Sequence, residues 1–175
     1  VAVTGVQTCA LPIYVPLTNT SNLPAEALEN EYPLMVDEYA LVPDSGGAGQ
    51  FRGGLGLARQ IRALVPGTIF SVRSDSHTVG IPSGVFGGGD GRRAKLIRNY
   101  GGADQEELFS KVARIEMKPG DSMRIETPGA GGYGNPADRS AEAIARDVRN
   151  GKVSREAAER SYGAERVIEA PITKA

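Results

Sequence analysis

The 175-residue chain lacks tryptophan and contains only ten aromatic residues, one cysteine and one histidine. The single cysteine, Cys9, excludes a disulfide within the chain and is typical of a reducing compartment, so we expect a cytoplasmic protein. No Cys and His residues occur at ligand spacing, which argues against a complete metal site in this chain. Because aromatic residues are few, the core is expected to be aliphatic.

An excess of charge of one sign is missing as well. Lys and Arg total 20 against 21 Asp and Glu, and no basic stripe is present, which argues against a nucleic-acid partner. No apolar run reaches the length of a membrane span, so no membrane partner is expected. The length suggests one domain with a possible appendage and is sufficient for a real core.

Glycine, in contrast, is abundant and clustered. Seventeen of the 23 glycines lie in three patches, Ser45–Gly56, Gly84–Gly102 and Gly129–Gly134. Glycine raises the entropic cost of folding, so a dense patch is tolerated mainly where the chain turns tightly or passes close to another group. The flanking segments are apolar and periodic, which favours loops built for accurate backbone placement over a linker.

The first residues have a different character. Val3–Ile13 (VTGVQTCALPI) corresponds to the translation of a common sequencing-library adapter. A signal peptide is the alternative, but the basic n-region and the continuous apolar stretch are missing. Residues 1–13, Cys9 included, are therefore expected to be a sequencing artefact, and the chain a fragment whose natural N-terminus lies upstream.

Pro24 in a first turn, followed by good helix formers, predicts a short helix over Asn22–Asn30. A series of strands is predicted to follow it. In the first strand, Leu34, Val36, Tyr39 and Leu41 are the core candidates. The last two strands are predicted to pair with each other across a tight turn at Lys118–Asp121. The predicted strands are Tyr32–Val42, Leu55–Val65, Thr68–Arg73, Leu96–Asn99, Lys111–Met117 and Ser122–Thr127.

After Asp138, the spacing of the apolar residues changes to that of a helix. A helix is predicted over Ser140–Asn150, with Gly151 as its stop, and a second helix from the N-cap Ser154 to Gly163. The sequence therefore predicts an α+β fold. It comprises a mostly antiparallel β body with Gly-rich loops (residues 14–137), a helical hairpin (138–164) and a loose tail (165–175).

The stretch Val72–Thr78 (VRSDSHT) is the densest in chemically versatile side chains. On a strand, Arg73 and Asp75 share one face, and His77 joins them if the strand continues. An arginine can hold a carboxylate or a ring carbonyl, and an aspartate can orient a histidine that acts as a base. The alternative is a structural Arg73–Asp75 ion pair with His77 on the surface.

Arg52, within SGGAGQFRGGLG, is a second candidate, because a loop with many free amides can bind an anion. The alternative is that Arg52 caps a carbonyl or pairs with Asp44. Asp121, Arg124 and Glu126 are predicted to be solvated. The segment Gly129–Gly134 satisfies G-x-G-x-x-G, but Asn135–Pro136 follows and no later strand completes a βαβ unit, which favours a structural turn over a dinucleotide site.

Taken together, these motifs resemble the C-terminal part of the hydantoinase B/oxoprolinase family. Related domains occur in 5-oxoprolinase and in acetone carboxylase-type enzymes. The resemblance covers essentially everything after the adapter-like segment. The matching stretches are Asn19–Leu34, Pro43–Leu57, Val72–His77, Pro82–Gly91, Lys118–Pro136 and Arg146–Gly163.

The resemblance implies an ATP-dependent enzyme that opens cyclic amides. An A-type subunit would use ATP to phosphorylate the ring carbonyl, and the B-type part would complete ring opening. ATP and a divalent metal are implied for the whole enzyme, with no complete site for either in this chain. Because the family's metal- and catalysis-associated motifs lie upstream, the fragment alone is expected to be inactive.

Within this resemblance, Asp75 and His77 are the candidate catalytic residues, and Arg52 and Arg73 the candidate substrate-binding residues. The substrate class is a small cyclic amide such as a hydantoin or 5-oxoproline. Two alternatives remain open: an ATP-dependent carboxylase of the acetone carboxylase type, and an assembly module without catalytic residues.

Overall fold

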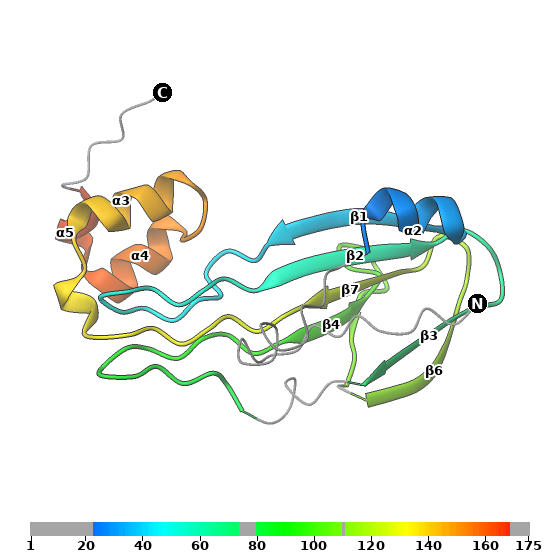
Figure 1. Ribbon diagram of the computed structural model, residues 1–175, viewed down its shortest axis with the longest axis horizontal. Helices are drawn as coiled ribbons and strands as arrows, with labels where there is room; N and C mark the ends of the chain where they lie inside the picture. Colours follow the sequence, from blue (N-terminus) through cyan, green and yellow to red (C-terminus); the bar gives the residue numbers. More distant parts are fainter. Residues whose placement is uncertain (1–22, 74–79, 110, 169–175) are drawn as a thin grey trace. The chain divides into compact units, whose positions relative to one another are not determined.

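The computed structural model describes residues 23–73, 80–109 and 111–168, and the chain divides into two compact units. Unit 1 draws its described residues from 23–40, 57–73, 94–109 and 111–127, and unit 2 from 41–56, 80–93 and 128–168. Each unit is thus assembled from segments that lie far apart in the sequence (Figure 1).

The main sheet of unit 1 has five strands. The short helix α2 (Ala25–Glu31) precedes it, and the strand order is β1-β2-β7-β4-β5. β7 pairs antiparallel with both β2 and β4, so that Arg124 lies opposite Gln60 on one side and Ile97 on the other. All five residues of β7 are buried, as expected of a central strand. The bounds are β1 (Leu34–Leu41), β2 (Leu57–Ala63), β4 (Lys95–Arg98), β5 (Glu106–Glu107) and β7 (Ser122–Glu126).

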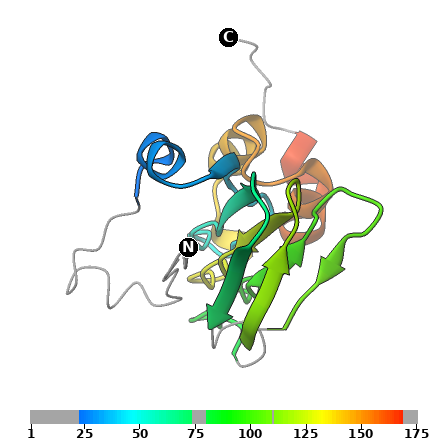
Figure 2. The same cartoon turned by 90° about the vertical axis from the view of Figure 1, so that its right-hand side faces the viewer.

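The remaining strands, β3 (Thr68–Arg73) and β6 (Lys111–Met117), form a separate two-stranded antiparallel sheet (Figure 2). The predicted pairing of β6 with β7 is therefore wrong, although the Asp121 amide does close a turn onto the Lys118 carbonyl (3.0 Å). The physical reason lies in burial. β7 needs a neighbour on both sides, whereas β6 is mostly exposed and has its partner in β3.

The core of unit 1 contains few aromatic side chains. Ala63, Met117 and Met123 are buried together, and Phe70, Leu108 and Ile115 pack against them. In β1, Leu34 is buried, but Tyr39 (54% exposed) and Leu41 (51% exposed) are not, so the prediction for these two was wrong. Side chains alternate along a strand, and β1 alternates so that Val36 and Glu38 are more buried than their neighbours.

Unit 2 combines the glycine-rich segments with a helical C-terminal part. α3 (Ala141–Arg149) and α4 (Arg155–Tyr162) confirm the predicted helices. The side chains of Ser140 and Ser154 cap them by accepting hydrogen bonds from the amides of the third helical residue. Gly163, at φ +92°, ends α4 in a conformation that favours glycine.

Two further helical segments complete unit 2. The 3-10 turn η1 (Pro136–Asp138) precedes α3, and α5 (Ala164–Ile168) follows α4 where the sequence indicated a tail. The helices of unit 2 share a core that contains Ile144 of α3, Ala158 and Tyr162 of α4, and Val167 of α5. Together, the antiparallel sheets and these helices confirm the α+β fold class. Within the described ranges, no helix combines the length and apolar character needed to cross a bilayer.

Candidate functional site

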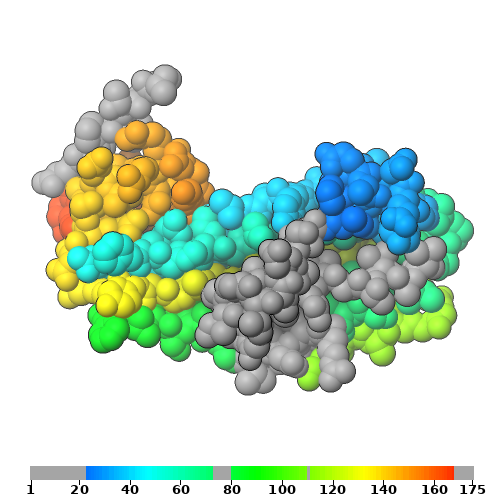
Figure 3. Space-filling view, in the orientation of Figure 1, coloured from blue at the N-terminus to red at the C-terminus, as the bar shows by residue number. Residues whose placement is uncertain are grey.

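The glycine-rich segments of unit 2 pack backbone against backbone. They run as adjacent cyan, green and yellow bands in Figure 3. A Cβ atom added to Gly53 would overlap the carbonyl oxygen of Ala130, and one added to Gly132 would overlap that of Ala48. These glycines are therefore required by close approach of the backbones rather than by unusual φ angles.

The amides of these glycines are used inside the unit. The Gly47 amide donates to the Ala130 carbonyl (2.9 Å), the Gly89 amide to Ala48 (2.7 Å) and the Gly132 amide to Gly89 (2.9 Å). Hydrogen bonds thus link all three segments, and these donors are not free to bind an anion. The arrangement is a rigid scaffold that can hold side chains in fixed positions.

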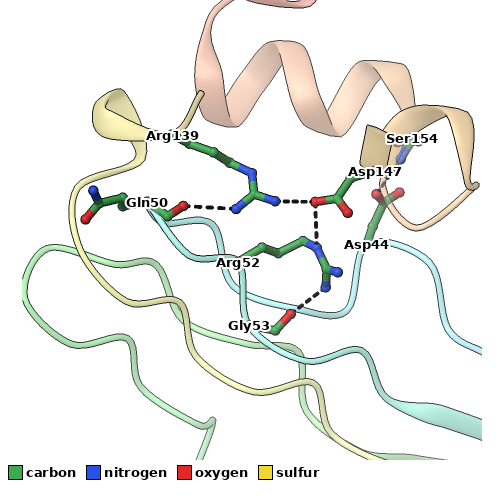
Figure 4. Close-up of polar contacts among 7 residues, drawn as sticks. All are labelled: Asp44, Gln50, Arg52, Gly53, Arg139, Asp147 and Ser154. Atoms are coloured by element: carbon green, nitrogen blue, oxygen red, sulfur yellow. Dashed lines mark hydrogen bonds and ion pairs between the residues drawn. The ribbon is translucent and has the colours of Figure 1, made fainter. Parts of the chain in front are cut away.

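Arg52 projects from this scaffold toward helix α3 (Figure 4). Its Nε donates to Asp147 Oδ2 (3.0 Å) and its Nη1 to the Gly53 carbonyl (2.5 Å). The carbonyl contact is one of the predicted alternatives. The predicted Asp44 pair is not formed, because Asp44 accepts a hydrogen bond from the Ser154 amide (2.7 Å) instead.

Asp147 also binds a second arginine. Arg139 donates through Nη2 to Asp147 Oδ2 (2.5 Å) and through Nη1 to the Gln50 carbonyl (3.0 Å). The side chains of Arg52, Asp147 and Arg139 are 13%, 9% and 9% exposed. This Arg52 cluster (Arg52, Arg139 and Asp147) ties α3 to the first glycine-rich segment. No local pattern in the sequence indicates it, because Arg52 and Asp147 are 95 residues apart.

The cluster carries two positive charges and one negative charge. Arg139 Nε is buried and has no hydrogen-bond partner among the described residues. Arg52 Nη2 likewise makes no bond to any of them. The cluster therefore retains donor capacity after its internal bonds are made.

The other predicted site residues lie elsewhere. Arg73 belongs to unit 1 and is the last residue of β3. In the β-sheet register, its backbone lies opposite that of Lys111 in β6. Asp75 and His77 lie outside the described residues. The predicted Arg73–Asp75–His77 face stays a prediction.

A buried charge cluster that the sequence analysis missed occupies unit 1. Arg124, 6% exposed, lies on the central strand β7. Its Nη1 binds Glu38, its Nε binds Glu126 Oε1 (2.8 Å), and its guanidinium lies 4.2 Å from the centre of the Tyr100 ring. The predicted solvated positions of Arg124 and Glu126 were wrong. The available signal was their i, i+2 spacing, which places an Arg and a Glu on one face of a strand.

In this Arg124 cluster (Glu38, Tyr100, Arg124 and Glu126), electrostatics favour the charged form of Arg124. Burial by itself lowers the pKa of Arg124, but the hydrogen bonds and charges of Glu38 and Glu126 outweigh it and hold the pKa above its usual value. The cluster therefore joins β1 to β7 across the intervening strand β2.

Asp121, also predicted to be solvated, has a side chain that is only 14% exposed. It accepts hydrogen bonds from Arg98 Nη2 (2.5 Å) and from the Lys118 amide (3.0 Å). Burial raises its pKa, but the Lys118 amide and Arg98 outweigh that effect and hold it below the ordinary value. Asp121 therefore stabilises the turn before β7.

Metal ligands do not gather in the part of the chain that the structure describes. No group of three or more His, Cys, Asp or Glu side chains there could hold a metal ion. The amides of Gly47, Gly89 and Gly132 donate to backbone carbonyls of neighbouring glycine-rich segments.

Comparison with known proteins identifies relatives of this chain. The model of a family described as Hydantoinase B/oxoprolinase matches residues 9–136. The chain is 40% identical over 129 residues to the 5-oxoprolinase PfmaA of Pestalotiopsis fici, which is 71% of this chain and 10% of that protein.

Two solved structures have similar folds. The ATP-dependent caprolactamase from Pseudomonas jessenii matches with a TM-score of 0.68 and 30% identity, over 80% of this chain and 24% of that one. Acetone carboxylase in its nucleotide-free state matches with a TM-score of 0.63 and 19% identity, over 80% and 22% of the two chains, which shows a shared fold alone. The chain thus spans about a quarter or less of the proteins it resembles.

Proposed function

The chain belongs to the hydantoinase B/oxoprolinase family, and we propose that it works as part of a B-type subunit that opens the ring of a cyclic amide in an ATP-dependent reaction with an A-type partner. The observation that carries this proposal is the match to the ATP-dependent caprolactamase, which combines a TM-score of 0.68 with 30% identity. We also propose that the protein is located in the cytoplasm.

The chemistry sets what the whole enzyme must supply. A ring amide is a poor electrophile, and phosphorylation of its carbonyl oxygen by ATP makes attack on the carbon easier. We assign ATP and any divalent metal to other parts of the enzyme, and among the described residues no group of three or more His, Cys, Asp or Glu could hold a metal ion. The ring-opening half of the reaction then needs cationic groups near the developing oxyanion and a base that activates water.

Within this scheme we assign substrate binding to Arg73 and Arg52, and we assign His77, oriented by Asp75, to base catalysis. Arg52 can contribute through Nη2, because its Nε and Nη1 are bound to Asp147 and Gly53. These roles remain proposals.

The test is turnover by the complete B-type subunit with its A-type partner. Hydantoin, 5-oxoproline and caprolactam are supplied in turn, and the ring-opened carboxylate and ADP are measured together. The proposal expects stoichiometric ADP and carboxylate with at least one ring and no dependence on bicarbonate. Turnover that requires bicarbonate would support the carboxylase alternative, and ring opening without ADP would overturn the proposal.

A second candidate, an assembly module, is favoured by one specific observation. The Arg52 side chain is 13% exposed and bound to Asp147, as expected of a structural tether. Arg52→Met distinguishes the two roles. A tether lowers the melting temperature and weakens association of the subunits at unchanged KM, whereas a substrate contact raises KM in an enzyme that stays assembled.

A further inference from the structure

Four large apolar side chains of the glycine-rich segments are exposed, and they form one aromatic patch. Phe51, Val85, Phe86 and Tyr133 are 62%, 50%, 79% and 48% exposed. The Tyr133 ring centre lies 6.2 Å from that of Phe51 and 5.2 Å from that of Phe86, and Val85 forms a backbone bridge with Tyr133. Contiguous exposed apolar groups of this kind mark interaction surfaces.

The backbone holds the patch rigid. Phe51 and Tyr133 exchange two hydrogen bonds (3.0 and 2.9 Å), and the Val85 amide donates to the Gly132 carbonyl (3.0 Å). Phe86 lies at φ +53°, a left-handed conformation that is unusual for a bulky residue. Structures retain such strain mainly where a side chain has a function to serve. The patch therefore loses little conformational freedom when a partner covers it.

The chemistry of the patch restricts the partner. Arg52, next to Phe51, is turned to Asp147, and Asp90 accepts a hydrogen bond from the Gly84 amide (2.9 Å). The four patch residues themselves are uncharged. Single-stranded nucleic acid requires a basic groove beside its stacking platforms, and anionic membranes attract lysine and arginine. An uncharged protein surface fits best, because tyrosine and phenylalanine are enriched at the centre of protein interfaces.

The size of the patch argues for a tethered partner. An aromatic side chain buries about 150–250 Å² when it is covered completely, so the exposed parts of these three rings offer roughly 400 Å². A stable interface between free proteins buries about 800 Å² on each side. A surface in the same polypeptide docks with less, because the tether already supplies a high effective concentration.

We propose that the aromatic patch packs against an uncharged apolar surface of the rest of a B-type subunit polypeptide. The caprolactamase from Pseudomonas jessenii has about three quarters of its length outside the region matched by this chain, and in a B-type subunit that length would supply the tethered surface. The inference rests on the proposed function only for the existence of that subunit, not for its catalytic activity.

Hydroxyl-radical footprinting tests the proposal. The oxidation rates of Phe51, Phe86 and Tyr133 are measured in the 175-residue chain, in the B-type subunit expressed from its complete gene, and in that subunit with the A-type partner added. The unfolded subunit gives the unprotected rate. The three rings should be reactive in the isolated chain and several-fold slower in the complete subunit without its partner.

Other outcomes overturn the proposal. Protection that appears only with the A-type subunit identifies that subunit as the occupant, and protection of the isolated chain that rises with concentration identifies a second copy. Rings that react equally in all three samples show that nothing covers them. Footprinting does not measure turnover. A failure of the docking proposal can therefore be distinguished from a failure of the proposed ring-opening function.

A variant gives a second readout. Phe86→Ser should lower the melting temperature of the complete subunit by several degrees and leave that of the isolated chain nearly unchanged, because Phe86 is 79% exposed there. An equal effect in both samples would show that Phe86 stabilises the chain itself and would contradict docking.

Discussion

At the scale of single residues, the chain uses buried arginines as structural links. Arg124 and Arg139 are 6% and 8% exposed, and each is bound to a carboxylate that is itself buried, Glu126 and Asp147. A buried charge is tolerated only when it is paired and hydrogen-bonded. Each arginine therefore fixes the relation between the elements that it joins.

Arg124→Met should be strongly destabilising. It removes the ion pair between Arg124 and Glu126, which is 5% exposed, and breaking a buried pair costs about 3–5 kcal/mol. Urea denaturation of the 175-residue chain measures the loss. Arg124→Met/Glu126→Met removes both buried charges and should recover most of the stability, since Glu38 is 39% exposed and can be solvated. If Arg124→Met alone is as stable as the parent, the Arg124 cluster does not contribute to stability.

The lowered pKa of Asp121 predicts that the free energy of unfolding depends on pH. Its pKa is lower in the folded chain than in the unfolded one, so its contribution is fully present above the ordinary aspartate pKa and disappears as pH falls through the folded value. Asp121→Asn should cost about 1–3 kcal/mol at pH 7, because Arg98 loses its charged partner.

The test of this prediction is the unfolding free energy of parent and Asp121→Asn between pH 7 and pH 2. Their difference should shrink below about pH 4. Glu116→Gln is the control, because Glu116 is 75% exposed in its pair with Arg114, and exposed pairs contribute about 0–1 kcal/mol. A difference that stays constant with pH would exclude titration of Asp121 as its source.

At the scale of elements, the glycine-rich segments depend on individual glycines to different degrees. Gly53 and Gly54 are neighbours, but an added Cβ would overlap the Ala130 carbonyl at Gly53, whereas at Gly54 its nearest neighbour is the Ala130 Cβ at 3.9 Å. Gly53→Ala should therefore destabilise by about 3 kcal/mol or more through backbone displacement.

Gly54→Ala is the matched control, and it should change stability by less than about 1 kcal/mol in either direction. Thermal unfolding of both variants measures the contrast. Equal stabilities would show that the segments do not approach each other as closely as the structure indicates.

Elements whose signals are local were predictable from the sequence, and pairings were not. Ser154 and Gly163 mark α4 by capping chemistry, and Thr68–Arg73 is recognisable as a strand from its β-branched residues. The partner of β6 depends on which strand is buried on both faces, a property of the assembled sheet. For the same reason, Arg52 and Arg124 are visible in the sequence, but the carboxylates that each of them binds could not be identified from it.

At the scale of the whole molecule, the residues proposed for chemistry belong to both units. Unit 2 holds the bonded glycine scaffold and Arg52, whereas unit 1 carries Arg73 at the end of β3, directly before Asp75 and His77 in the sequence. β3 pairs with β6 up to Arg73, which lies opposite Lys111, after an irregularity in register between Phe70 and Val72.

Arg73→Ala tests this role in the assembled enzyme. If the Arg73 guanidinium contacts the oxyanion that develops on the ring carbonyl, its loss should lower kcat/KM by about 10²–10³-fold, mainly through kcat. Arg73→Lys should recover part of the activity, because the charge is kept while the bidentate geometry is lost. Arg62→Ala is the control, since that arginine is 41% exposed and bound to Asp37. The readouts are steady-state turnover and the melting temperature. A fall in activity that follows a fall in melting temperature, or unchanged kinetics, would remove Arg73 from the site.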